Sequence, residues 1–362
     1  MRRQLRLLNA PRSQTTLRAA IENNGRVNNF DLLRLIAATM VLVSHSFPLT
    51  GRREGGFPGT TDTLGFVGVL IFFSISGFLI AQSWATDPRP WEFMLKRARR
   101  ILPALAVSLL VTSYVIGAVV TTLPLTEYLA SPIPFKFVVL NLAQLTNYEL
   151  PGVFLSNHSH GANGSLGTLP VEVKAYVAVL VIGMTLASRR PLGRLAWCAL
   201  LIPVALASYG TGVKPPHTLT QLFVLFAGAA TYYLLRRRVV LSPWILALAI
   251  LAWQLSYGLP FYGHILIQAV AFPYIVLFLA YRWLSPLRHL VRPGDVSYGI
   301  FIWAFPVQQT IIHLVPLISP WQLIGLALPT TYGIALLSWH VIERPALRWR
   351  RGVPLVEPRN PR

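Results

Sequence analysis

The chain has few of the residues that water-soluble proteins place on their surfaces. Only 12% of its 362 residues are charged, whereas about a quarter are charged in an average soluble protein. Acidic residues are the scarcest, with 12 Asp and Glu against 32 Lys and Arg, and 54% of the chain is hydrophobic. This composition argues against a soluble domain and predicts an all-α, polytopic bundle of transmembrane helices.

Cysteine is almost absent too, since Cys198 is the only one. A single cysteine excludes a disulfide framework and a cysteine metal site. His158 and His160 lie in a polar loop without nearby carboxylates, so we expect no bound metal. The net charge of +20 can indicate nucleic-acid binding, but basic residues of membrane proteins gather in cytoplasmic loops for topological reasons. We therefore expect a lipid bilayer as partner and no nucleic acid.

Ten hydrophobic segments are near the length needed to cross about 30 Å of hydrocarbon. They fall at about 30–49, 64–84, 101–122, 166–187, 195–210, 219–235, 241–257, 264–283, 297–315 and 321–342. This division places 27 of the 32 basic residues on one side, four on the other, and Lys174 within a span. Because basic loops stay in the cytoplasm, we expect about ten spans with both termini cytoplasmic.

The two ends of the chain read as tails of the membrane domain. Residues 1–27 are basic and lack the apolar core of a cleavable signal peptide, so we expect a cytoplasmic tail there. The transmembrane domain is expected at 28–345, and a second cytoplasmic tail at 346–362. A bacterial inner membrane suits this multi-pass organisation.

The first span carries ionisable residues, which are costly in hydrocarbon and usually face a protein or water-lined interior. Arg34 and His45 are eleven residues apart, which is three helical turns with about 20° left over. They therefore share one face, about 16 Å apart along the axis. A neutral imidazole there suits general-base work on a hydroxyl. The structural alternatives are that Arg34 only anchors the helix and that His45 only packs against a neighbour.

A second candidate motif is basic and lies at the entry to the third span. Arg97 and Arg100 are spaced i, i+3 and so lie on one helical face. Two guanidinium groups at this spacing suit a phosphate-bearing ligand. A topological stop signal and binding of lipid head groups are the alternatives.

A third candidate is Glu172 in the fourth span. Counted from Leu166, Glu172 lies about 9 Å below the outer surface, a depth similar to that of His45. We expect the carboxylate to orient the imidazole, as in other His–acid pairs. The alternative is that Glu172 pairs with a different cation.

The glycines between Gly65 and Gly77 favour close helix packing. Asp295-Val-Ser-Tyr-Gly and Ile342-Glu-Arg-Pro are expected to be mainly structural helix ends.

These motifs, in this order, resemble the acyltransferase-3 family of bacterial integral-membrane acyltransferases. The matching stretches are Phe30-Asp-Leu-Leu-Arg34 with His45; Gly68–Ile80; Arg97-x-x-Arg100-Ile-Leu-Pro103; Ser165-Leu-x-Thr-Leu-Pro-Val-Glu172-Val; Ser297-Tyr-Gly-Ile-Phe; and Ile342-Glu-Arg-Pro345. Two positions depart from the family pattern. Gly167 stands where the family usually has Trp, and Ala304 stands where it often has His.

The resemblance implies transfer of an acyl group, commonly acetyl, from cytoplasmic acyl-CoA to a hydroxyl of a glycan or other acceptor. It implies that Arg34, His45, Arg97 and Arg100 are functionally essential. We therefore expect the three arginines to bind the phosphates of the donor, and His45, oriented by Glu172, to act in catalysis. A covalent acyl-histidine relay is a less favoured variant. The main rival function is a transporter or flippase for a lipid-linked saccharide, which would use the same intramembrane charges as a substrate path. A scaffold that binds acyl-CoA without turnover is a further alternative.

Overall fold

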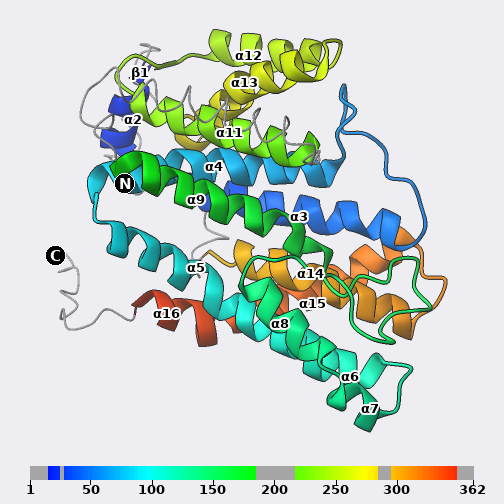
Figure 1. Cartoon of the computed structure of the whole chain (residues 1–362). Coiled ribbons are helices and arrows are strands. Elements are labelled where there is room, and N and C mark those ends of the chain that lie inside the picture. Colours follow the sequence, from blue (N-terminus) through cyan, green and yellow to red (C-terminus); the bar gives the residue numbers. More distant parts are fainter. Residues whose placement is uncertain (1–14, 25–27, 185–216, 284–294, 349–362) are drawn as a thin grey trace, which may run out of the picture.

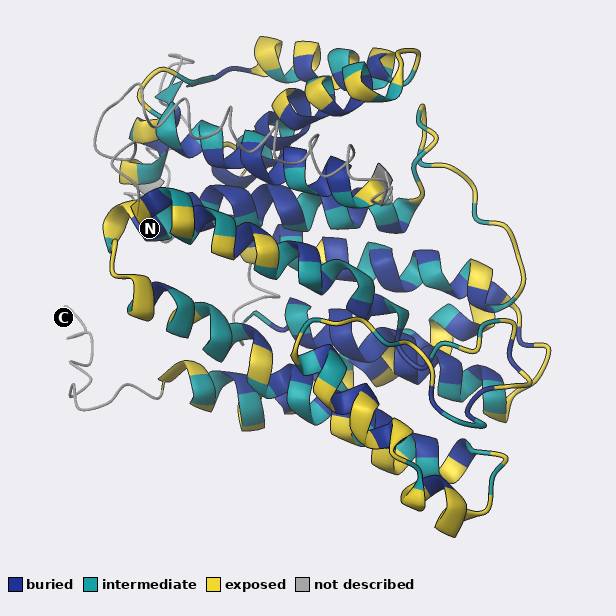
Figure 2. Ribbon diagram, in the orientation of Figure 1, coloured by how far each residue is buried: buried dark blue, intermediate teal, exposed yellow. Residues whose placement is uncertain are grey.

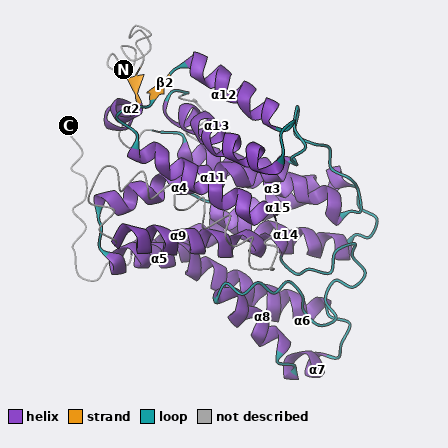
Figure 3. Ribbon diagram, turned by 45° about the horizontal axis from the view of Figure 1, so that its top comes forward, coloured by secondary structure: helices purple, strands orange, loops and turns teal. Residues whose placement is uncertain are grey.

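The computed structural model describes residues 15–24, 28–184, 217–283 and 295–348. This part of the chain is mostly helical, with one short antiparallel pairing between β1 (Thr15–Thr16) and β2 (Val240–Leu241) (Figure 3). Six of its helices are long and apolar enough to cross a membrane: Phe30–Leu49, Leu64–Thr86, Pro90–Val120, Gly164–Met184, Phe261–Tyr281 and Pro320–Arg348. The predicted class of helical membrane protein is thus confirmed at this level.

The helices follow the predicted hydrophobic segments closely. Their bounds are α2 (Leu17–Asn24), α3 (Phe30–Leu49), α4 (Leu64–Thr86), α5 (Pro90–Leu110), η1 (Val111–Ile116), α6 (Gly117–Val120), α7 (Leu125–Ala130), α8 (Ile133–Leu142), η2 (Gly164–Thr168), α9 (Leu169–Met184), α11 (His217–Leu234), α12 (Pro243–Ser256), α13 (Phe261–Tyr281), α14 (Ser297–Leu314), α15 (Pro320–Ser338), η5 (Trp339–Glu343) and α16 (Arg344–Arg348). Predicted segment 195–210 lies outside the described residues. Each of the other nine overlaps a helix.

The third helix starts earlier than its hydrophobic segment. We expected a span from about residue 101, and α5 begins at Pro90. Proline is favoured in the first turn of a helix, because its fixed φ suits the helix and its missing N–H would have no partner there. The basic motif that contains Arg97 and Arg100 therefore lies on a continuous helix, where the i, i+3 spacing does place both residues on neighbouring positions of one face.

Helix α4 lies at the centre of the bundle, between α3 and α11 (Figure 1). It runs antiparallel to α3, since Phe78 near its end contacts Phe30 at the start of α3, with ring centroids 6.0 Å apart. The glycines of α4 permit this closeness: a Cβ on Gly68 would lie 2.6 Å from the Ala37 carbonyl oxygen. The predicted packing role of this glycine-containing segment is confirmed.

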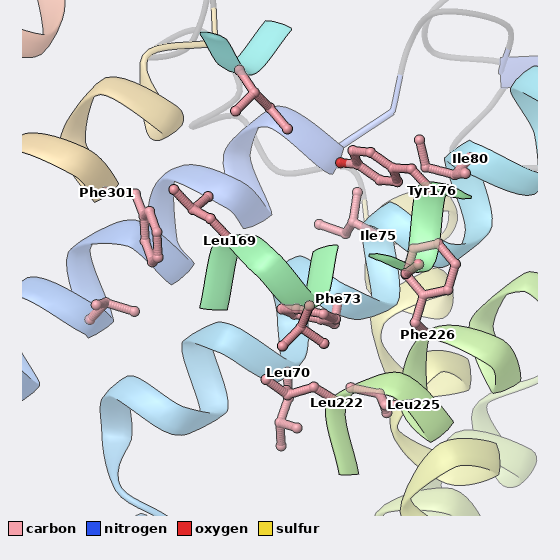
Figure 4. Close-up of a cluster of buried hydrophobic side chains, with 14 of the residues drawn as sticks. Leu70, Phe73, Ile75, Ile80, Leu169, Tyr176, Leu222, Leu225, Phe226 and Phe301 are labelled. Atoms are coloured by element: carbon pink, nitrogen blue, oxygen red, sulfur yellow. The ribbon is translucent and has the colours of Figure 1, made fainter. Parts of the chain in front are cut away.

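Buried residues concentrate on α4 and on the faces of its neighbours, while the outer faces of the bundle are exposed (Figure 2). Apolar side chains of α4, including Leu70 and Phe73, meet Leu169 of α9 and Leu222 of α11 (Figure 4). This core fixes α3, α4 and α9 relative to one another, and these three helices bear the first-span motif and Glu172.

Candidate active site

A cavity of about 360 Å³ lies among α3, α4, α5, α9 and α14. Its polar lining groups are Arg34, Ser76, Lys96, Arg97, Arg100, Thr168, Glu172, Tyr176, Ser297 and Tyr298. Its apolar walls include Val69, Phe72, Phe73, Leu169 and Phe301. The cavity therefore brings the three predicted arginines together with Glu172, while His45 is not among the residues that line it.

Two of the arginines share one carboxylate. Arg34 of α3 and Arg100 of α5 donate to the same oxygen, Oδ2 of Asp295, over 3.1 Å and 2.5 Å. The side chains are largely shielded from solvent, with exposed fractions of 22% for Arg34, 27% for Arg100 and 11% for Asp295. Arg34 also bonds Asp31 over 3.3 Å, as its i, i+3 spacing predicts.

Asp295 has a larger role than the expected one, which was to end a helix. Its Oδ1 accepts hydrogen bonds from the backbone N–H and the hydroxyl of Ser297, in the first turn of α14. Burial raises the pKa of Asp295, but the charges of Arg100 and Arg34 and the bonds from Ser297 outweigh burial, so the pKa lies below its ordinary value. Sequence reasoning missed the contact with the arginines. The available signal was an aspartate at a helix start in a chain with only 12 acidic residues.

The Ile342-Glu-Arg-Pro motif, at the junction of η5 and α16, also contributes a carboxylate. Glu343 is 1% exposed, and its Oε2 lies 4.0 Å from Nη1 of Arg100. Its Oε1 accepts a hydrogen bond from Ser338 over 3.2 Å. Both motifs that we expected to be mainly structural therefore place an acid beside the arginines.

Arg97 has different surroundings from those of Arg34 and Arg100. Its Nη2 donates to the Ser83 hydroxyl over 2.8 Å, and its guanidinium carbon lies 5.1 Å from the centre of the Phe93 ring. Among the described residues, no carboxylate forms an ion pair with it. Since a guanidinium has five N–H donors, most of its hydrogen-bonding capacity is unused.

Glu172 does not meet His45. Its Oε1 accepts hydrogen bonds from the hydroxyls of Ser76, at 2.9 Å, and of Tyr176, and no hydrogen bond joins it to His45 in the described part of the chain. Ser76 lies on α4 near Phe78, which contacts the start of α3. Glu172 thus lies level with the Arg34 end of α3, and the expected pairing with the imidazole is wrong.

The predicted depth of Glu172 is wrong because η2 does not start at a surface of the bundle. Pro306 has no N–H, so the carbonyl of Ile302, four residues earlier, has no helical donor. The Asn163 side chain donates to this carbonyl over 3.0 Å. A Cβ on Gly164 would lie 2.5 Å from the Phe305 ring. The loop before α9 thereby enters the bundle beside the middle of α14. Glu172, which follows this loop, therefore lies deeper than the count from Leu166 predicts.

His45 packs at the other end of α3. Its ring lies nearly perpendicular to that of Phe305, with centroids 5.4 Å apart. Its Nδ1 is buried without a hydrogen-bond partner among the described residues. Gln308 of α14 donates to the Leu42 carbonyl and the Ser46 hydroxyl, over 2.8 Å and 2.7 Å, and so fixes α3 on both sides of the imidazole.

The next residue, Gln309, fixes the loop that precedes η2. Its Nε2 donates to the carbonyls of Ser159 and Gly161, over 2.6 Å and 2.7 Å. Asn157 donates to its side-chain oxygen over 2.9 Å. The sequence signal that we missed was two successive glutamines within a hydrophobic segment, because buried polar residues in membranes usually have a partner or a function.

Helix α14 connects the two ends of α3. Asp295, just before α14, bonds Arg34, and Phe305 in α14 contacts His45. The prediction that Arg34 and His45 share one face is therefore confirmed. Phe301 lines the cavity and lies one helical turn, about 6 Å, from Phe305. The cavity wall at Phe301 thus lies one helical turn from the residue whose ring contacts the imidazole.

The two departures from the family pattern have local explanations. A Cβ on Gly167 would lie 2.6 Å from the hydroxyl of Tyr148, so the tyrosine fills the space beside the glycine. Ala304 is 1% exposed and packs in an apolar cluster with Leu42 and Leu49. Within the described residues, no group of three or more His, Cys, Asp or Glu is arranged to hold a metal ion.

Comparison with known proteins agrees with the resemblance seen in the motifs. Residues 27–339 match the acyltransferase-3 family, described as an acyltransferase domain. An "O-acetyl transferase" of Shigella phage Sf6 is 30% identical over 334 residues, which cover 88% of this chain and 95% of the relative. "Nodulation protein 10" of Rhizobium leguminosarum bv. viciae is 29% identical over 363 residues, covering 91% and 95%. No solved structure matches. The chain therefore belongs to the acyltransferase-3 family.

Proposed function

We propose that the protein is a membrane O-acyltransferase that moves an acyl group, acetyl in the simplest case, from cytoplasmic acyl-CoA to a hydroxyl of an extracytoplasmic or membrane-linked glycan. The observation that supports this most directly is the arrangement along α3. One end supplies Arg34 to a cavity lined by cations, and the other end supplies His45, with α14 in contact with both. The relative from phage Sf6 bears the name of an O-acetyl transferase.

The cavity suits an anionic donor with an apolar middle. Arginine binds phosphate through several parallel hydrogen bonds, and three arginines and Lys96 line the cavity. The apolar walls lead towards Phe301 and therefore towards His45. In this proposal the phosphates of acyl-CoA bind on the cationic side of the cavity and the pantetheine arm lies along the apolar walls. The thioester then lies beside Phe305.

The chemistry is an acyl substitution assisted by a general base. The acceptor oxygen attacks the thioester carbonyl carbon while neutral His45 takes the hydroxyl proton. The C–S bond then breaks, the acyl group stays on the acceptor oxygen, and the CoA thiolate takes the proton from the His45 imidazolium, which regenerates the neutral base. Glu172, together with Ser76 and Tyr176, forms a polar group within the donor cavity, so we now assign Glu172 to the donor rather than to the imidazole.

The proposed topology follows from charge. About ten spans with both termini in the cytoplasm would place 27 of the 32 basic residues inside. We propose residues 28–345 as the transmembrane domain of a bacterial inner-membrane protein, with residues 1–27 and 346–362 as cytoplasmic tails. The Arg34 end of α3 is then cytoplasmic and His45 is near the outer surface.

Two measurements test the proposed activity. Purified protein in lipid nanodiscs should release CoA thiol from acetyl-CoA when a glycan extract is added, and the glycan should gain the mass of an acetyl group. In cells, mass spectrometry of surface glycans from wild-type and deletion strains should show loss of one acetyl substituent. Glycan transport that persists without any acyl transfer would instead favour the flippase.

A further inference from the structure

The four cations that line the cavity have different partners. Arg34 and Arg100 both bond Asp295, and Lys96 bonds Asp87 over 2.8 Å. Arg97 donates only to the neutral Ser83 hydroxyl among the described residues. The family motif presents Arg97 and Arg100 as an equivalent pair, whereas the structure gives one of them a carboxylate and leaves the other without one.

Asp295 joins groups that would otherwise repel one another. Two guanidinium cations that approach one point repel each other, and the negative charge on Oδ2 of Asp295, which bonds both, offsets that repulsion. Its other oxygen, Oδ1, is occupied by Ser297 at the start of α14. The carboxylate is therefore fixed to a helix and bonds one arginine from α3 and one from α5.

The same contacts orient more than the cations. The helix that starts beside Asp295 contains Phe301 in the cavity wall and Phe305 against His45. A change in the angle between α14 and the two arginine-bearing helices would therefore alter the cavity mouth and its apolar end together. Glu343, 4.0 Å from Arg100, adds a second negative charge on the same side.

We propose that Asp295 is a positioning residue that holds Arg34 and Arg100 as a fixed pair, and that Arg97 is the cation that binds a phosphate of the acyl donor. This inference rests on the proposed function, since it takes the donor to be an acyl-CoA. It divides the three arginines into two that shape the cavity mouth and one that contacts the anion.

The test measures binding and turnover separately, with CoA itself as the binding probe. Asp295→Asn keeps an oxygen for Ser297 but removes the charge between the arginines. We expect its Kd for CoA, measured by calorimetry in nanodiscs, to rise about tenfold, as for loss of a charge-assisted hydrogen bond. We expect kcat at saturating acetyl-CoA to change less than about threefold, because the proposed chemistry takes place at His45. Asp62→Asn, an aspartate that bonds Tyr257 away from the cavity, is the matched control and should bind like wild type.

Coupling tests whether Asp295 acts through its partner. Arg100→Gln combined with Asp295→Asn should weaken CoA binding by less than the sum of the two single effects, since both changes break the same unit while Arg34 loses its contact only with Asp295→Asn. Additive losses in the double variant would overturn the positioning role, as would an unchanged Kd in Asp295→Asn.

Arg97→Gln tests the other half of the proposal without touching Asp295. It should abolish measurable CoA binding, and wild-type binding by this variant would overturn the proposal even where Asp295→Asn does not fold. If the proposed function itself is wrong, the outcome differs, because wild-type protein would then bind no CoA. Normal wild-type binding with unaltered variants would overturn this inference alone.

Discussion

The two ends of α3 differ in how their ionisable groups are paired. Around Arg34 and Arg100, the carboxylates of Asp31, Asp295 and Glu343 each lie within 4.0 Å of a cation, and Asp295 uses both of its oxygens, although Oε2 of Glu343 has no hydrogen-bond partner among the described residues. Around His45, Nδ1 of the imidazole and Oε1 of Gln308 are buried without partners among the described residues. A buried polar atom without a hydrogen bond costs about 1–3 kcal/mol. The protein itself thus pairs the charges of Arg34 and Arg100, whereas the imidazole at the His45 end keeps hydrogen-bonding capacity for a ligand.

The largest effect is expected at the His45 end. His45→Gln removes the base and should lower kcat for acyl transfer about 10²- to 10⁴-fold, while the Kd for CoA stays within about twofold because the arginines are untouched. The rate of thiol release from acetyl-CoA in the presence of acceptor measures kcat.

His313→Gln is the control for this prediction. His313, in α14, is a second histidine whose Nδ1 is buried without a hydrogen-bond partner among the described residues, but the proposed chemistry does not use it. Equal losses in the two variants would mean that a buried imidazole is needed for folding rather than for proton transfer.

Stability should be most sensitive at the Arg34 end. Arg100→Met leaves Asp295 and Glu343 with fewer cations and should destabilise the protein by about 3 kcal/mol, as when one partner of a buried ion pair is lost. Thermal unfolding in detergent micelles measures this. Arg99→Met, one residue away and outside the cavity lining, should melt near the wild-type temperature. An unchanged melting temperature for Arg100→Met would contradict the claim that the ion pairs at the Arg34 end of α3 stabilise the fold.

Glu172→Gln separates the two assignments of this residue. If Glu172 belongs to the donor cavity, the variant should raise KM for acetyl-CoA by about tenfold, since a charged hydrogen-bond acceptor is lost. The pH dependence of kcat should stay that of the wild type. A shifted pH dependence with an unchanged KM would restore the original hypothesis that Glu172 orients His45.

The smallest expected effect concerns acid pH. Because the folded protein lowers the pKa of Asp295, its ionic contacts stabilise the fold fully above the ordinary aspartate pKa. This stabilisation is lost as pH falls through the lower, folded-state pKa. Asp295→Asn should therefore show a weaker decline of melting temperature below about pH 4 than wild type. Identical acid profiles for the two proteins would show that Asp295 is not ionised in the cluster.

Predictions from the sequence were reliable wherever they concerned the residues of a single helix. The spacing of Arg34 and His45 fixed their common face, because helical periodicity relates residues within a single element. The glycines of α4 also predicted close packing correctly, because the lack of a side chain is a property of the residue itself. The partner of Glu172 could not be found in this way, since it depends on the depth at which a separate segment begins.

The sequence by itself determined the class of the protein, the helical segments and the residue types of the site, because hydrophobic length and periodicity are local properties. Only the tertiary structure decided which charges meet. Asn163 binds a carbonyl freed by Pro306 in a helix 139 residues away, and this contact sets the depth of Glu172. Asp295 likewise joins arginines from two other helices. Such contacts depend on long-range packing, and no spacing within one segment encodes them.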